Sequence, residues 1–209
     1  DYLGLGQGEG QHNYCHSKTE ASATIDLILA SKDFSEGQGI DVGEQLFLMG
    51  YSQGGHVTMA AVKEIEENYT DLINLTASCP MAGPYSMSEA QTTMLNVVYP
   101  NPGYFPYVIF SYQRVYGNIY ETTEEIFMPG FESLFELYEG NYSMGQINDS
   151  IWSIAENIYE IDPSDFTPLD MIQADYYNDY LNNAEHPFHL ALTDNDLIDF
   201  TPQAPMQIM

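Results

Sequence analysis

A G-x-S-x-G turn, Gly50-Tyr-Ser-Gln-Gly54, constrains this sequence more than any other feature because of the segments on either side of it. The short apolar run Leu46-Phe-Leu-Met49 precedes it directly, and such a run is typical of a parallel strand covered on both faces. An amphipathic helical pattern follows, with its apolar face formed by Val57, Ala60, Ala61 and Ile65. The pattern therefore predicts a buried strand over 44–49, a sharp turn over 50–55 and then a helix.

The spacing of this turn suits a reactive serine. A serine at the apex adopts a positive φ, which lifts its hydroxyl clear of the sheet. The residues two before and two after the serine face each other, so a Cβ at Gly50 or Gly54 would clash. The pattern predicts Ser52 as a nucleophile and the backbone amide of Gln53, at the N-terminus of the helix, as one oxyanion donor. The turn around them is formed by Gly50, Tyr51, Gly54 and Gly55. The alternative is a glycine-rich strand–helix turn with a solvated serine.

The neighbouring segments continue an alternation of helices and strands. Ser17-Lys-Thr-Glu20 has the form of a capping box and predicts a helix that ends near Lys32. Leu72–Cys79 predicts a second buried strand that Pro80 closes, and residues 204–209 predict a third. We therefore expect an α/β fold with about three parallel strands and flanking helices.

A long region interrupts this order after the second strand. Residues 85–200 carry tyrosine, phenylalanine, methionine and isoleucine in short helical patterns that prolines separate. A connecting loop of this length is not expected in a compact domain, so the region predicts a large helical cap, or lid, inserted into the core. The expected organisation is a core over 1–84, the cap over 85–200 and a return strand over 201–209. The sole arginine, Arg114, lies in the cap, where an ion pair and a substrate contact are both open.

The charge balance excludes several classes of partner. The sequence has 4 Lys and Arg residues against 31 Asp and Glu residues, which gives a formal net charge of −27. Such a chain repels phosphate backbones and anionic lipid headgroups, so we expect no nucleic-acid binding. No apolar run reaches the roughly 18 residues of a membrane-spanning helix, so we expect no integral membrane segment. The acidic composition fits either adaptation to high salt or an acidic secreted protein.

The sequence predicts neither a metal site nor a cofactor. Cys15 and Cys79 lack the spacing of a zinc site, and the carboxylates are scattered. We expect two buried thiols, with a single bridge as the alternative. The glycine-rich opening over 1–10 does not fit a nucleotide-binding fingerprint. Four Asn-x-Ser/Thr sequences hint at an exported protein, and they begin at Asn68, Asn74, Asn141 and Asn148.

These motifs resemble those of the α/β-hydrolase superfamily, in particular secreted lipases and carboxylesterases of the secretory-lipase type. The residues that carry the resemblance are Asp1-Tyr-Leu-Gly-Leu-Gly6, His12, Tyr14, His16, Gly50-Tyr-Ser-Gln-Gly-Gly-His56, Pro80-Met-Ala-Gly-Pro-Tyr85, Asn195, Pro202 and Ala204-Pro205. The resemblance covers 1–85 and 186–209. It implies a partial α/β-hydrolase sheet with Ser52 as the nucleophile and a cap that forms the substrate wall.

The resemblance also implies that parts of the site lie outside the sequence. In this fold an acid and then a histidine follow the serine along the chain, and both would lie past residue 209. The second oxyanion amide would lie before Asp1. We therefore interpret the sequence as an internal fragment of a larger chain that is nearly inactive by itself, because a serine without a base is a weak nucleophile.

The residues near the turn fit supporting roles. His56 lies one helical turn after Ser52, so its ring is expected to point away from the turn and to serve in packing or capping. His12, His16 and Tyr2 are candidates for lining the pocket.

The residues near the return strand are expected to be structural. His186 and His189 flank Pro187 and Phe188 there. Three aspartates precede the last strand, and one of them could serve as a displaced acid; they are Asp194, Asp196 and Asp199.

The sequence therefore predicts a serine hydrolase that cleaves carboxylic esters of small molecules or lipids through an acyl-enzyme on Ser52. A peptidase or an acyl transferase on the same scaffold is one alternative, since a fold does not determine its substrate. A non-catalytic binding protein with a relic turn is another. We expect a secreted or periplasmic protein.

Overall fold

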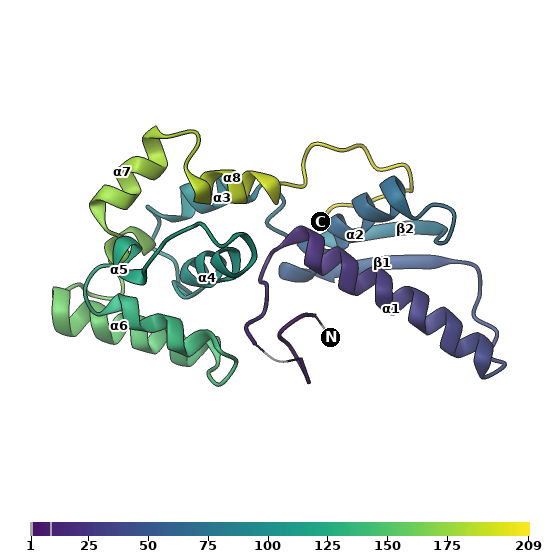
Figure 1. Cartoon of the computed structure of the whole chain (residues 1–209), viewed down its shortest axis with the longest axis horizontal. Helices are drawn as coiled ribbons and strands as arrows, with labels where there is room; N and C mark the ends of the chain where they lie inside the picture. The colour runs from purple at the N-terminus through teal and green to yellow at the C-terminus, as the bar shows by residue number, and fades with distance from the viewer. Residues whose placement is uncertain (1, 9) are drawn as a thin grey trace. The chain divides into compact units, whose positions relative to one another are not determined.

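The computed structural model describes residues 2–8 and 10–209, so Asp1 of the predicted opening loop, like Glu9, lies outside the described residues (Figure 1). The chain divides into two compact units. The core unit comprises Asp1–Gly8, Cys15–Ser86 and Asn195–Met209, and the helical unit comprises Glu9–Tyr14 and Met87–Asp194. Each unit is described by itself below.

The core unit has the α/β order that the sequence predicts. Its elements are α1 (Ser17–Gly37), β1 (Leu46–Tyr51), α2 (Gln53–Asn68) and β2 (Leu75–Met81). β1 and β2 lie side by side in a parallel pair, with Phe47 opposite Ala77 and Gly50 opposite Pro80 (Figure 1). α2 packs on both strands and α1 packs on α2.

The C-terminal segment forms a third parallel line of hydrogen bonds beside β2. Ser78 N donates to Pro205 O at 3.0 Å, and Gln207 N donates back to Ser78 O at 3.0 Å. Met209 N then donates to Pro80 O at 3.2 Å. Pro80 has no N–H to complete this pair, so only the contact between Ser78 and Met206 counts as a regular bridge. The three expected strands are therefore two regular strands and this segment.

The helices cover one face of the sheet only. Ile25 of α1, Ile65 of α2 and Ile73 form a buried cluster, against which Leu46 and Leu48 of β1 pack. The alternate residues of β1 point to the other face and are 61%, 72% and 71% exposed; they are Phe47, Met49 and Tyr51. The described chain therefore covers β1 on one face and leaves apolar sheet surface uncovered on the other, as expected for a partial sheet, although the apolar run by itself is typical of a strand covered on both faces.

The start of α1 differs from the predicted capping box. The N-cap is His16, whose side chain accepts from Thr19 N, and Ser17 is already helical. The Glu20 carboxylate accepts from Cys15 N, just before the N-cap, rather than from Ser17 N, and it lies in the interior, where the side chain is 1% exposed. The helix also continues past the predicted end at Lys32 to Gly37.

Two further expectations need correction. β2 does not end before Pro80 but runs through it to Met81, because a proline at this position forfeits one hydrogen bond and its carbonyl still accepts one. Both cysteines are free thiols, as expected. Only Cys15 is buried, however, and Cys79 is partly exposed.

The helical unit confirms the predicted helical insertion. Its α-helices are α3 (Met87–Met94), α4 (Tyr104–Tyr116), α5 (Thr123–Ile126), α6 (Met144–Tyr159), α7 (Ala174–Asn182) and α8 (Pro187–Asp194). Two 3₁₀ helices, η1 (Phe131–Tyr138) and η2 (Pro168–Met171), complete it. Aromatic side chains form a large part of its core, among them Phe110, Tyr112, Phe127, Phe131 and Phe188.

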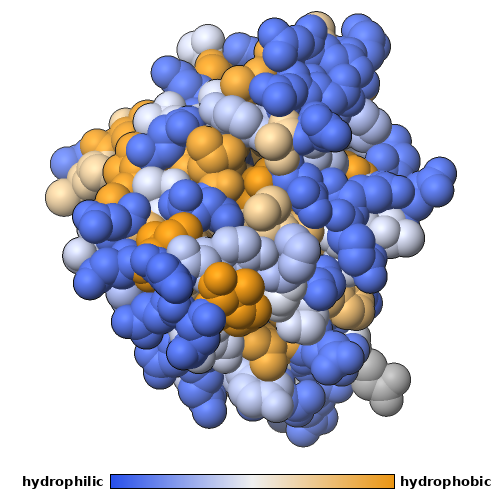
Figure 2. Space-filling model, turned by 90° about the vertical axis from the view of Figure 1, so that its left-hand side faces the viewer, coloured by the Kyte–Doolittle hydropathy of each residue, from blue (hydrophilic) through white to orange (hydrophobic). Residues whose placement is uncertain are grey.

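The visible surface is mainly hydrophilic. On the face that Figure 2 shows, hydrophilic residues predominate and apolar residues gather in small patches. Among the helices of the described residues, none combines the length and the apolar character that crossing a membrane requires.

Candidate active site

Ser52 lies at the corner between β1, which ends at Tyr51, and α2, which begins at Gln53. Its backbone has φ 55° and ψ −120°, so the expected positive φ is confirmed. Its N–H donates to Met81 O at 2.9 Å and its carbonyl accepts from Gly55 N at 2.8 Å, which holds the corner in this conformation. The hydroxyl makes no capping hydrogen bond, and the residue is exposed. The strained corner thus presents a serine hydroxyl on the surface of the core unit.

The corner depends on close approaches of backbone that glycine permits. A Cβ on Gly50 would lie 2.1 Å from the carbonyl oxygen of Gly54. A Cβ on Gly55 would lie 2.5 Å from Met81 O, so the first turn of α2 rests directly on the end of β2. A Cβ on Gly54, in contrast, would meet nothing within 4 Å. The expectation that both Gly50 and Gly54 must lack a side chain is therefore correct for Gly50 and wrong for Gly54.

Gln53 is the first residue of α2, where backbone N–H groups have no acceptor within the helix and the dipole is positive. This is the position that suits an oxyanion donor. The side chain of Gln53 turns the other way, and its Nε2 donates to Glu20 Oε1 at 2.7 Å. Tyr51, the residue before Ser52, has a side chain that is 71% exposed.

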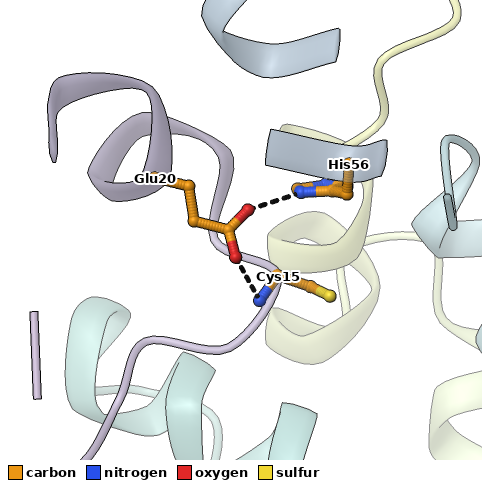
Figure 3. Close-up of side chains that lie close together, drawn as sticks. All are labelled: Cys15, Glu20 and His56. Carbon is orange, nitrogen blue, oxygen red and sulfur yellow. Dashed lines mark hydrogen bonds and ion pairs between the residues drawn. The ribbon is translucent and has the colours of Figure 1, made fainter. Parts of the chain in front are cut away.

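A buried polar cluster lies beside this corner and consists of Cys15, Glu20 and His56 (Figure 3). Glu20 Oε2 is 2.7 Å from His56 Nδ1, and Glu20 Oε1 accepts from Cys15 N at 3.1 Å. The expected packing role of His56 agrees with its complete burial. Within the described part of the chain this is the one group of three His, Cys, Asp or Glu residues whose donor atoms lie within 4.8 Å of one another. A metal ion there would have to displace the hydrogen bonds of Glu20.

Backbone strain gathers around the same corner. The described chain has four non-glycine residues with positive φ, and three of them are Cys15, Ser52 and Ala82. Cys15 donates to Glu20, while Ala82 follows the residue that accepts from Ser52 and itself donates to Met209 O at 2.7 Å. Strained residues of this kind concentrate at functional sites because the surrounding structure must hold them in place.

Three further residues were predicted near the substrate. His16 caps α1, and its Nδ1 lies 3.4 Å from Thr19 N. Tyr2 is partly buried, and burial together with the nearby Glu20 charge raises the pKa of its hydroxyl. His12 belongs to the helical unit, where its ring meets those of Tyr14 and Tyr107 edge to face. Their role in lining a pocket stays a prediction.

His186, His189 and Arg114 contact other residues of the helical unit. His186 Nδ1 accepts from Phe188 N at 3.2 Å, and the ring of His189 meets that of Tyr180. Among the residues that the structure describes, no carboxylate lies within ion-pair distance of Arg114, whose guanidinium lies against Gly10. The expected ion pair of Arg114 is therefore not found in that part of the chain.

The sequence reasoning assigned no role in the site to two residues of the core unit that the structure brings to the corner. Glu20 was taken for a cap, and its burial depends on donors 33 and 36 positions later. Asn195, which is fully buried, places its backbone oxygen 3.4 Å from His56 Nε2. Neither position carries a periodic signal, so only the tertiary structure reveals them.

Comparisons with known proteins extend this description. No family model matches the chain, and no curated protein matches it in sequence. Among solved structures, the rice cell wall degrading esterase LipA from Xanthomonas oryzae is 32% identical, with a TM-score of 0.83 over 99% of this chain and 53% of its own. A Legionella pneumophila protein provisionally assigned as a hydrolase is 27% identical, with a TM-score of 0.81 over 100% of this chain and 53% of its own.

A more distant match shows the fold alone. Candida antarctica lipase A is 17% identical, with a TM-score of 0.64 over 94% of this chain and 42% of its own. The chain thus spans about half the length of the structures that it resembles.

Proposed function

We propose that this chain, which has the fold of part of an α/β-hydrolase, carries the nucleophile of a serine hydrolase that cleaves carboxylic esters. The observation that carries the proposal is the conformation of Ser52, strained at φ 55° between β1 and α2 with its hydroxyl exposed and not used as a cap. The similarity to LipA, an esterase, favours esters over the amides that the same corner could serve.

The proposed reaction has two steps. Ser52 Oγ attacks the ester carbonyl, a histidine takes its proton, and the Gln53 amide with a second amide binds the oxyanion. The alcohol leaves with the proton returned by the histidine, and water then releases the acid from the acyl-enzyme. Within the described chain no histidine nitrogen hydrogen-bonds Ser52, and His56 is held by Glu20. We place the acid and the histidine after residue 209 and the second amide before residue 1, in the chain order of this fold.

The proposed substrate is an ester of a small molecule or a lipid. LipA acts on the rice cell wall, and that substrate is not carried over to this chain. The helical unit is proposed as the substrate-binding cap. The proposal is supported by its many aromatic side chains, since ligand pockets are lined mainly by apolar and aromatic groups. Export of the protein is also proposed; its support is three exposed Asn-x-Ser/Thr sites, since the fourth, Asn148, is buried and bonds Gly103 N.

The test is covalent labelling of the full-length protein that contains this chain. A fluorophosphonate probe should label the unaltered protein and the control Ser31→Ala, whose serine is exposed on α1, and should fail on Ser52→Ala. Chromogenic esters should be hydrolysed and aminoacyl amides left intact. Absence of label on Ser52 would remove the enzymatic reading, and amide cleavage exceeding ester cleavage would favour a peptidase.

A further inference from the structure

We propose that the buried carboxylate of Glu20 is a positioning group for the oxyanion site, acting through the side chain of Gln53. The inference rests on the proposed function, because it assigns a role to residues around the proposed nucleophile. In this role the two side chains bond each other and act by holding the backbone amide of residue 53.

The carboxylate of Glu20 contacts three polar partners, one from the segment ahead of α1 and two from the first turn of α2. Its Oε1 accepts from Cys15 N at 3.1 Å, ahead of α1, and from Gln53 Nε2 at 2.7 Å, at the first residue of α2. Its Oε2 lies 2.7 Å from His56 Nδ1, one turn further along α2. The side chains of Glu20 and His56 are 1% and 0% exposed, so water does not compete for the bond between them, while Gln53 is partly exposed.

Burial makes the arrangement specific. A carboxylate removed from water is costly unless donors surround it, and removal of one partner leaves the others buried and unpaired. His56 faces an oxygen from each ring nitrogen, Glu20 Oε2 at 2.7 Å and Asn195 O at 3.4 Å. The first turn of α2 is thereby fastened to α1 at two points, Gln53 and His56.

The bond between Gln53 and Glu20 matters for the chemistry because the backbone amide of Gln53 is the proposed oxyanion donor. The first N–H groups of a helix have no intrahelical acceptor, so the amide of Gln53 is free to bind an oxyanion, and the backbone bonds of Ser52 hold the corner on one side of it. An oxyanion donor must point at the developing charge before the reaction begins, and a displacement of about 1 Å can cost about 100-fold in rate. The bond of 2.7 Å from Gln53 Nε2 to Glu20 fixes that residue from its side-chain end.

The decisive variant is Gln53→Met in the full-length protein. It removes the bond to Glu20 and keeps the backbone amide, the Glu20–His56 pair and the bond from Cys15. We expect kcat to fall about 10-fold with KM nearly unchanged, because the amide is misdirected and substrate binding is not. The affinity for a trifluoromethyl ketone, which mimics the tetrahedral intermediate, should fall by a similar factor. Gln38→Met, at an exposed glutamine after α1, is the matched control and should change neither quantity.

Two variants of Glu20 separate positioning from folding. Glu20→Gln keeps an oxygen for Gln53 and can donate to a neutral His56, so we expect kcat to stay within about 3-fold of normal. Glu20→Met removes every acceptor and should lower kcat at least as much as Gln53→Met. The double variant should be no slower than Glu20→Met alone, since both changes break one link. Titration of Ser52 with a fluorophosphonate counts the active sites. Dividing the rate by this number gives a kcat that excludes unfolded protein.

The outcomes distinguish this inference from the function on which it rests. Unchanged kcat per titrated site in Gln53→Met, or losses that simply multiply in the double variant, overturn the positioning role and leave the proposed function intact. A failure of the probe to label Ser52 in the unaltered protein overturns both.

Discussion

The side-chain oxygen of Asn195 accepts two hydrogen bonds from Ser17, one from its backbone N–H at 2.7 Å and one from its hydroxyl at 3.0 Å. The two residues are 178 positions apart in the sequence. Ser17 is the first residue of α1, where the N–H has no acceptor within the helix. The buried side-chain amide of Asn195 therefore accepts from the first N–H of α1 and ties residues 195–209 to the start of that helix.

We predict that Asn195→Ala destabilises the protein by about 2–3 kcal/mol, because it leaves the N–H of Ser17 buried without an acceptor. Ser17→Ala removes only the hydroxyl bond and should cost about 1 kcal/mol. Denaturant unfolding of both variants measures the difference. Equal losses in the two variants would show that the capped N–H contributes nothing.

The two glycines that flank Ser52 should respond in opposite ways to alanine. Gly50→Ala places a Cβ against the Gly54 carbonyl, 2.1 Å away, and should destabilise the fold by about 3 kcal/mol or more. Gly54→Ala meets open space at a helical position and should be neutral or stabilising by up to about 1 kcal/mol. Thermal unfolding of the two variants is the measurement. Destabilisation by Gly54→Ala would contradict the geometry of the corner.

The corner could be predicted from sequence because its signals are local. The apolar run of β1, the glycine at 50 and the helical periodicity after Ser52 each depend on residues within one turn or strand. The predicted end of β2 at Pro80 was wrong for a physical reason. A proline ends a strand only where its missing N–H is needed, and Pro80 keeps its carbonyl bond to Met209.

The buried cluster could not be predicted for a different reason. Glu20 follows a serine at capping-box spacing, and the local pattern alone favours a carboxylate that bonds the helix N-terminus. The donors that draw it inward, Gln53 and His56, lie on another helix. The carboxylate keeps a local partner in the N–H of Cys15, which has a positive φ, and adds two partners on α2 that the local pattern does not indicate.

His186 should make the stability depend on pH. Burial lowers the pKa of this histidine, with a smaller opposing effect of Asp179, and its Nδ1 accepts from Phe188 N, which requires the neutral ring. The unfolded chain therefore binds a proton more readily than the folded one, so stability falls as the pH drops below the ordinary value of 6.5.

The variant His186→Asn tests this dependence. Its side-chain oxygen can accept from Phe188 N and does not titrate. We expect the unaltered protein to lose more stability than the variant between about pH 7 and pH 5 in denaturant unfolding. Parallel curves for the two proteins would refute the role of His186.

The uncovered face of the sheet should make this 209-residue chain associate with itself. Phe47, Met49 and Tyr51 are 61–72% exposed on β1, and their partners on β2 across the same face include Ala77 and Cys79. A contiguous apolar face of this kind favours association in water, and a lysine on an exposed strand opposes it. We expect the chain to elute as oligomers in size-exclusion chromatography with light scattering, and Met49→Lys to shift it toward the monomer.

The choice of lysine separates this local effect from net charge. A lysine makes the strongly acidic chain less negative, and a smaller net charge by itself promotes association. A shift toward the monomer must therefore come from the sheet face. Leu27→Lys changes the charge equally at a leucine of α1 that is 62% exposed, so it is the matched control and should not dissociate the oligomers. If both variants dissociate them alike, or if the unaltered chain is already monomeric, the face of β1 does not drive association.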